Sequence, residues 1–193
     1  MVSVLAFLLP VPYVWRVNRQ VTAEVDSFEI LRQSYVQQLA DADAGKSLDA
    51  ARLMFEGERS RIERLEDKLA GRRAALELVL PLTLTLVGVS IGQGQAWTAT
   101  IGVLAACSAA LGYFATTSAN STFPFFVPGT ADLVSDLASA TPELHQGSRY
   151  LACCELNQPR GTILNNWVWV THVAFAHAVV LLAAGLLILT ATT

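Results

Sequence analysis

The chain has 193 residues, of which 53% are hydrophobic and only 15% are charged, whereas an ordinary soluble domain has about 25% charged residues. A net charge of −3, with no aromatic side chains interleaved among the bases, argues against a nucleic-acid-binding protein. Most charges lie between Arg16 and Arg73 and none lies between Gly161 and Thr193, which predicts an integral membrane protein with a separate charged region.

Residues 1–15 are apolar, but the segment is short and is interrupted by Pro10 and Pro12. It lacks the basic start of a secretory signal. We expect a short apolar anchor, a partial span or a full additional span, followed directly by Arg16 and Arg19.

Residues 16–73 are predicted to form a charged helical hairpin with its break at Ala44-Gly45-Lys46. Two apolar stripes with helical spacing support this prediction, and Glu58 takes one apolar place in the second: Val21, Val25, Phe28, Tyr35 and Leu39; then Leu48, Ala51, Phe55, Ile62, Leu65 and Leu69. The coiled-coil-like spacing suits packing within the chain, and it equally suits pairing with another protomer.

Residues 74–118 are predicted to form a transmembrane helical hairpin. The first run contains a single acid, Glu77, near its start and Pro81 one turn later, and the second run has no charge and opens on Trp97, a typical interface anchor. Only residues 93–95 separate the runs, so the chain must turn back at once.

Residues 119–161 are predicted to form a cytoplasmic or interfacial helical loop, with helix starts at Thr130 and Thr141. Residues 162–193 are predicted to form the C-terminal transmembrane helix, with Pro159 in its first turn. The expected fold is an all-α membrane bundle of three transmembrane helices, or four if residues 1–15 also span.

Orientation follows from the bases nearest the spans. The turn at 93–95 has none, whereas the segment before the first span carries six: Arg59, Arg61, Arg64, Lys68, Arg72 and Arg73. We therefore expect the charged N-terminal half on the cytoplasmic side of a bacterial inner membrane and the C-terminus outside.

Three ionisable residues lie inside the predicted spans, namely Glu77, His172 and His177. Five helical residues turn by about 500°, so the two imidazoles diverge by roughly 140° and cannot share a metal ion. A neutral histidine bonded across the bundle is favoured over a proton relay. Glu77 either pairs with Arg73 one turn back or faces a pore.

No pattern of catalytic, metal-binding or cofactor-binding residues is evident. Cys153 and Cys154 are adjacent instead of two residues apart, the spacing usual for zinc, and no second cluster completes four ligands. Phosphate-binding loops and the motifs of serine and zinc hydrolases are absent from the sequence. We therefore expect neither an enzyme nor a bound cofactor.

Small residues recur every four positions in the first two spans, at Gly88 and Gly92 and at Gly102, Ala106 and Ala110. Such spacing lets helices approach closely in a bilayer. The contact is either within one chain or between copies, and we expect a homo-oligomer or association with other membrane subunits.

The charged segment Glu56 to Ala70, which leads directly into a span and a tight hairpin, resembles small bacterial multi-span membrane effectors of nucleotide-activated antiphage systems. The resemblance covers residues 47–118 and lies in the arrangement more than in a motif. It implies an oligomer that perturbs or permeabilises the inner membrane.

The leading expectation is a non-enzymatic, oligomeric inner-membrane protein, with a pore or membrane perturbation as output and the cytoplasmic helices as input. The alternative is a structural or accessory subunit of a larger membrane complex. An intramembrane enzyme using His172, His177 or Glu77 is the least favoured reading, because perturbed ionisable groups usually gather at catalytic sites and these are scattered.

Overall fold

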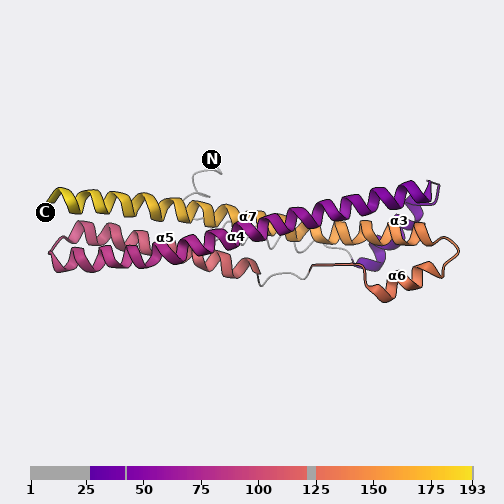
Figure 1. Ribbon diagram of the computed structural model, residues 1–193, viewed down its shortest axis with the longest axis horizontal. Coiled ribbons are helices and arrows are strands. Elements are labelled where there is room, and N and C mark those ends of the chain that lie inside the picture. Colours follow the sequence, from indigo (N-terminus) through magenta and orange to yellow (C-terminus); the bar gives the residue numbers. More distant parts are fainter. Residues whose placement is uncertain (1–26, 42, 121–124, 193) are drawn as a thin grey trace. The chain divides into compact units, whose positions relative to one another are not determined.

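A computed structural model describes residues 27–41, 43–120 and 125–192. Every regular element within these ranges is an α-helix (Figure 1): α3 (Phe28–Leu39), α4 (Ala44–Gly92), α5 (Ala96–Asn120), α6 (Thr130–Leu137) and α7 (Pro142–Thr192). The predicted all-α class is confirmed. The prediction that residues 1–15 form an anchor or a further span falls outside the described residues.

In the described part of the chain, three helices are long and apolar enough to cross a membrane, and they are α4, α5 and α7. Each contains one of the three predicted apolar runs. A hydrocarbon layer about 30 Å thick needs about 20 apolar residues in a helix. By length and composition, the protein is a multi-pass helical membrane protein.

The described helices form two compact units. The charged unit contains residues 27–65 and 125–164, and the apolar unit contains residues 66–120 and 165–192. Both α4 and α7 contribute residues to each unit, whereas α3 and α6 belong to the charged unit and α5 to the apolar unit.

The predicted apolar stripe of α4 is buried in the charged unit, at Ala51, Phe55, Ile62 and Leu65. At the place where the stripe is interrupted, Glu58 is half-buried and accepts a 2.7 Å hydrogen bond from Nε of Arg61. The acid is tolerated there because a base one turn later neutralises it.

Helix α7 covers the stripe of α4 and also packs on α3. The Phe55 ring centroid lies 5.5 Å from that of Tyr150 on α7, and Leu31 of α3 packs with Ala152 and Leu156 of α7. The charged unit is therefore more than a two-helix hairpin, because residues predicted to form an interfacial loop supply much of its core.

The expected break before the third span is absent, since α7 runs from Pro142 to Thr192 with Pro159 inside it. The predicted position of Pro159 in a first turn is therefore wrong, although the predicted helix starts near Thr130 and Thr141 are confirmed. Proline lacks an N–H and leaves the carbonyl four residues earlier without its helical donor. The helix continues because both flanks are anchored, by Leu156 before the proline and Ile163 after it.

The apolar unit contains the predicted tight hairpin between α4 and α5. Gly94 has a positive φ of 70°, a conformation that glycine adopts at little cost. At this end of the unit, the side-chain amide of Gln95 donates a 2.7 Å hydrogen bond to the hydroxyl of Thr192, which ties the turn to the end of α7.

All three helices contribute to the core of the apolar unit. Leu76 and Val79 of α4 cluster with Ala109 of α5 and Ala178 of α7. A Cβ built on Gly102 would lie 2.8 Å from a methyl carbon of Val87, so α5 and α4 approach each other very closely at this glycine. Small residues allow such an approach, and van der Waals contact then holds the helices together in lipid.

One hydrogen bond fixes the register of α7 against α4. The guanidinium of Arg72 lies 3.0 Å from Nδ1 of His172, so His172 is level with a residue that precedes the apolar run of α4. From Val173 to Thr190 the helix rises about 27 Å, which is close to the thickness of the hydrocarbon layer. The residues that follow His172 are thus numerous enough for an apolar crossing, and the predicted bounds of this span, residues 162–193, stay a prediction.

A leucine on the buried side of α5 should lower the stability of the apolar unit, whereas a leucine on its exposed side should have little effect. Gly102→Leu should lower the stability of the apolar unit by about 1–3 kcal/mol or more, because the new side chain has no room against Val87. Thr100→Leu is the matched control, because this residue is exposed on the same helix and its hydroxyl bonds to a carbonyl of that helix. Thermal unfolding of the full chain in detergent measures both, and equal effects would contradict the packing described.

Candidate functional site

The predicted small-residue positions divide into two groups. Gly102 is buried against α4 of the same chain, whereas Ala110, Gly88 and Gly92 are exposed and Ala106 is half-buried. Other small residues that α5 buries include Ala105 and Ala109, each one residue before a member of the predicted series. A contact between copies at the outward positions stays a prediction.

Glu77 forms the ion pair expected with Arg73, whose Nε donates to a carboxylate oxygen at 3.0 Å. The same guanidinium donates at 3.1 Å to the hydroxyl of Tyr113, and its central carbon lies 5.3 Å from that ring's centroid. The acid therefore sits in an ion pair at the start of the apolar run.

The two histidines do not share a site. His172 is exposed and bonded to Arg72 of α4, while His177 is half-buried further along α7. Arginine can only donate, so Nδ1 of His172 accepts and the ring proton of a neutral imidazole is on Nε2. The described residues include no group of three or more His, Cys, Asp or Glu side chains arranged to hold a metal ion.

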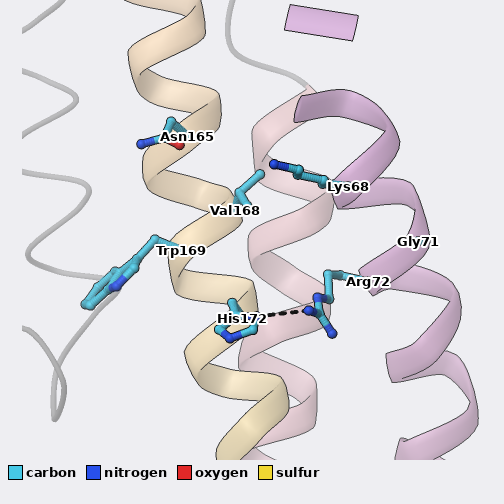
Figure 2. Close-up of a pocket in the computed structure, with 7 residues that line it drawn as sticks. All are labelled: Lys68, Gly71, Arg72, Asn165, Val168, Trp169 and His172. Atoms are coloured by element: carbon cyan, nitrogen blue, oxygen red, sulfur yellow. Dashed lines mark hydrogen bonds between the residues drawn. The ribbon is translucent and has the colours of Figure 1, made fainter. Parts of the chain in front are cut away.

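A cavity of about 600 Å³ lies between α4 and α7 beside this histidine (Figure 2). Its lining combines two bases, a histidine, an amide and apolar surface and includes no carboxylate: Lys68, Gly71, Arg72, Asn165, Val168, Trp169 and His172. Lys68 and Arg72 extend from α4 toward α7, whereas the Trp169 ring extends to the other side of α7. We call this cavity the basic pocket.

A second cavity, of about 400 Å³, shares the α4 segment but has a different charge balance. Two acids, Glu66 and Asp67, line it together with Arg73, and Leu69, Ala70 and Thr116 complete it. The basic pocket therefore has an excess of positive charge, whereas acids outnumber bases in the lining of its neighbour.

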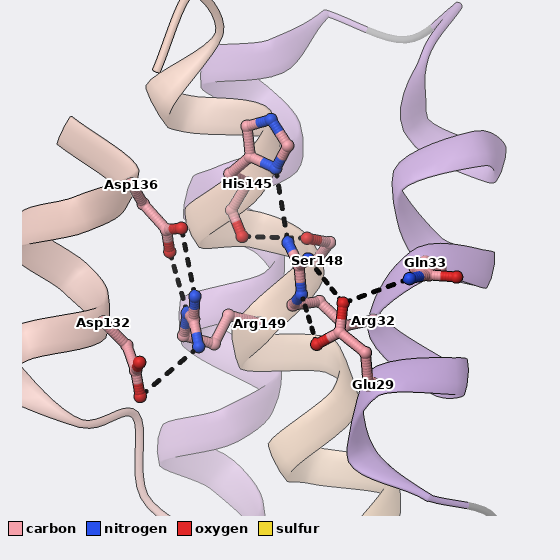
Figure 3. Close-up of polar contacts among 8 residues, drawn as sticks. All are labelled: Glu29, Arg32, Gln33, Asp132, Asp136, His145, Ser148 and Arg149. Atoms are coloured by element: carbon pink, nitrogen blue, oxygen red, sulfur yellow. Dashed lines mark hydrogen bonds and ion pairs between the residues drawn. The ribbon is translucent and has the colours of Figure 1, made fainter. Parts of the chain in front are cut away.

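The charged unit contains a polar network that sequence reasoning missed (Figure 3). Arg149 of α7 donates to both carboxylate oxygens of Asp136 on α6, at 2.8 and 3.0 Å, and all these groups are buried. Asp132, one turn earlier on α6, lies 3.5 Å from the same guanidinium. The hydrogen bonds to Asp136 raise the pKa of Arg149 above its usual value.

Across α7 from this pair, a second cluster connects α3 to α7. Arg32 donates at 2.7 Å to Glu29 on its own helix and reaches Nδ1 of His145 at 3.4 Å. The hydrogen bond from Arg32 lowers the pKa of Glu29. The only signal in the sequence was the four-residue spacing of Asp132 and Asp136, which is compatible with many partners.

Potentially reactive groups in the charged unit are held in unreactive states. Burial raises the pKa of the Cys153 thiol to about 11 and also raises the pKa of Cys154. Burial and a 2.6 Å hydrogen bond to Glu155 raise the pKa of the Tyr35 hydroxyl to about 12. Because a thiolate is the nucleophilic form of cysteine, these thiols are poorly suited to catalysis at neutral pH.

The fold and these contacts define a multi-pass helical membrane protein with a helical charged unit. No protein-family model, curated protein or solved structure matches the chain.

The ion pair of Arg149 should contribute strongly to the stability of the charged unit. Asp136→Ala should lower the free energy of unfolding by about 3–5 kcal/mol, because it leaves a buried guanidinium without its main partner. Asp132→Ala should cost less than about 1 kcal/mol, because that side chain is 58% exposed compared with 6% for Asp136. Denaturant unfolding of the full chain in detergent, followed by circular dichroism, compares the two, and equal losses would refute this ranking.

The thiol of Cys153 should react slowly in the folded protein. At pH 8 we expect alkylation by iodoacetamide about a hundredfold slower than for an exposed thiol, because a pKa of about 11 leaves little thiolate. A Cys107→Ser background removes the exposed thiol of α5. Peptide mass analysis then separates Cys153 from Cys154, and unfolding should restore the ordinary rate. Rapid labelling of native Cys153 would contradict its burial.

Proposed function

We propose that the protein is a non-enzymatic, oligomeric membrane protein that acts by perturbing or permeabilising the bilayer, with the charged unit as its signal-receiving part. The observation that carries the proposal is the difference between inward and outward glycines of the apolar unit. The space beside Gly102 and Gly112 is filled by other residues of the same chain, whereas a Cβ added to Gly88 or Gly92 has nothing within 4 Å. Close approach at small residues drives helix association in lipid, so these outward positions suit a second copy.

The interior of the apolar unit favours a conducting path between copies of the protein over a path through a single chain. Three buried hydroxyls, those of Thr83, Thr116 and Thr171, each donate to a carbonyl of their own helix at 2.7, 2.7 and 2.9 Å. A water path needs polar groups that face it. These three hydroxyls are already bonded, and the buried hydroxyl of Ser90, which has no partner among the described residues, cannot line a path across the layer alone, so a conducting path is expected where several protomers meet.

The non-enzymatic part of the proposal is supported by the pairing of the chemically capable groups. Arg149 is bound to Asp136, Tyr35 to Glu155 and Arg73 to Glu77. Perturbed groups at active sites usually converge on one cleft. Here they are distributed over both units and serve the packing of helices.

We further propose that the charged unit lies on the cytoplasmic side of a bacterial inner membrane. The six bases from Arg59 to Arg73 precede the first apolar run, and the turn at 93–95 contains none. Bases near the span ends set orientation, and the first spans usually dominate. This arrangement places the C-terminus on the opposite side.

A second candidate, an accessory subunit of a larger membrane complex, is favoured by the surface of the charged unit. Six large apolar side chains there are more than half exposed: Ile30, Leu53, Met54, Val127, Val134 and Leu137. Exposed apolar surface outside the membrane commonly marks a protein interface. A different protein that copurifies in fixed stoichiometry would support this candidate over the first.

The oligomer is tested by measuring the mass of the full chain in detergent and dye release from vesicles. The wild type should have a mass that is a multiple of 20.8 kDa and should release dye. Gly88→Leu combined with Gly92→Leu should give a folded monomer with at least tenfold less release, because bulky side chains separate the helices.

Thr100→Leu is the control, because this residue is exposed on α5 and its hydroxyl bonds only to a carbonyl of its own helix. It should keep the mass and the dye release of the wild type. A monomeric wild type that leaves vesicles intact would overturn the proposal.

A further inference from the structure

The basic pocket concentrates unbalanced positive charge. Among the described residues, no carboxylate lies within ion-pair distance of Lys68 or Arg72, whereas Arg73, the next residue, is paired with Glu77. A cavity lined by two bases and no acid favours an anionic occupant. The cavity beside Arg73, with two acids and one base in its lining, provides an internal comparison at nearly the same position on α4.

Arg72 is held in place before any ligand arrives. Its guanidinium donates to Nδ1 of His172 at 3.0 Å, and its central carbon lies 5.1 Å from the ring centroid of Phe175. Neither contact neutralises the charge, and a guanidinium retains further N–H donors for a bidentate partner. The loss of side-chain freedom on binding is reduced for a side chain already positioned in this way.

The depth of the pocket matches that of lipid headgroups. Lys68 and Arg72 precede the apolar run of α4, which begins at Ala74, and His172 is bonded to Arg72 at the same level. Trp169 is 39% exposed beside them, as expected for an indole in an interfacial belt. A phosphate in the pocket would lie where a phospholipid holds its own phosphate.

An apolar groove continues along the same two helices. It has a volume of about 160 Å³, and its lining is almost wholly apolar: Leu82, Thr85, Leu86, Val89, Leu182, Leu186 and Leu189. Leu82 and Leu86 follow Lys68 and Arg72 by two heptads, and Leu182 and Leu186 follow Val168 and His172 by the same interval. Residues two heptads apart share a helix face with a drift of about 40°, so pocket and groove open on the same side of the α4–α7 seam.

The spacing of pocket and groove fits one lipid molecule. Fourteen residues of helix rise by about 21 Å, comparable to a fully extended acyl chain that reaches from the headgroups to the middle of a hydrocarbon layer about 30 Å thick. A soluble phosphate compound would use the basic pocket and leave the groove without a role.

We propose that one anionic phospholipid binds along the α4–α7 seam, with its phosphate held by Lys68 and Arg72 and an acyl chain in the groove. Asn165 supplies a further polar side chain to the pocket. The proposal depends on membrane insertion alone and is independent of the proposed oligomer and its effect on the bilayer.

The test uses the purified full chain in detergent and native mass spectrometry. Dioleoyl phosphatidylglycerol should be retained at least tenfold more than dioleoyl phosphatidylcholine, because only the former has a net negative charge. Arg72→Gln should remove that preference. Arg73→Gln removes the same charge one residue later and should leave retention within twofold, because Arg73 is already bound to Glu77.

A second variant acts without a change of charge. Gly71 lines the pocket and a Cβ there meets nothing within 4 Å, so Gly71→Leu should fill part of the cavity and lower retention at least tenfold while the helix stays intact. Equal retention of both lipids by the wild type, or equal losses in the Arg72 and Arg73 variants, would overturn the proposal.

Two further ligands separate a lipid from a soluble phosphate. Dihexanoyl phosphatidylglycerol has chains too short to reach the groove and should bind at least tenfold more weakly than the dioleoyl form. Inorganic phosphate at millimolar concentration should not displace the dioleoyl lipid. Full displacement by phosphate, or equal binding of the short lipid, would overturn the assignment to a phospholipid.

Discussion

The apolar unit depends on the close approach of α5 and α7 to two adjacent residues of α4. A Cβ on Gly102 of α5 would meet Val87, and one on Gly185 of α7 would meet Leu86. Adjacent residues on a helix point about 100° apart, so α4 presents one side to each neighbour. Lipid provides no hydrophobic force between helices, and van der Waals contact must replace it. These close contacts set the positions of α5 and α7 around α4, and thereby which faces of the three helices point outward.

The sequence predicts what local rules control. The buried stripe from Ala51 to Leu65, the turn at Gly94 and the Arg73–Glu77 pair follow from helical spacing, glycine stereochemistry and the one-turn neighbour rule. The register of α7 against α4 does not follow from local rules. The apolar run from residue 162 onward does not show which of its residues lies level with the start of the apolar run of α4. Only the contact between Arg72 and His172, one hundred residues apart, places the histidine at the boundary.

The small residues of α5 show that four-residue spacing alone does not identify the face that the chain buries. Steps of four residues rotate by about 400°, so Gly102, Ala106 and Ala110 drift by roughly 40° per step across the helix. Burial follows alternating steps of three and four from Gly102, through Ala105, Ala109, Gly112 and Thr116. The sequence has small residues at both sets of positions. The partner helices decide between them, and the sequence does not show those partners.

Polar side chains bond to different partners in the two units. In the charged unit, buried groups bond across helices, as Arg149 does to Asp136, and so they specify which helices pack together. In the apolar unit, Thr85 donates to the carbonyl of Pro81 on its own helix, and the carbonyl that Pro81 leaves without a donor belongs to Glu77, near the boundary where water is present. Side-chain hydrogen bonds between helices of the apolar unit occur at both of its ends, from Gln95 to Thr192 beside the turn and from Arg72 to His172 at the charged edge.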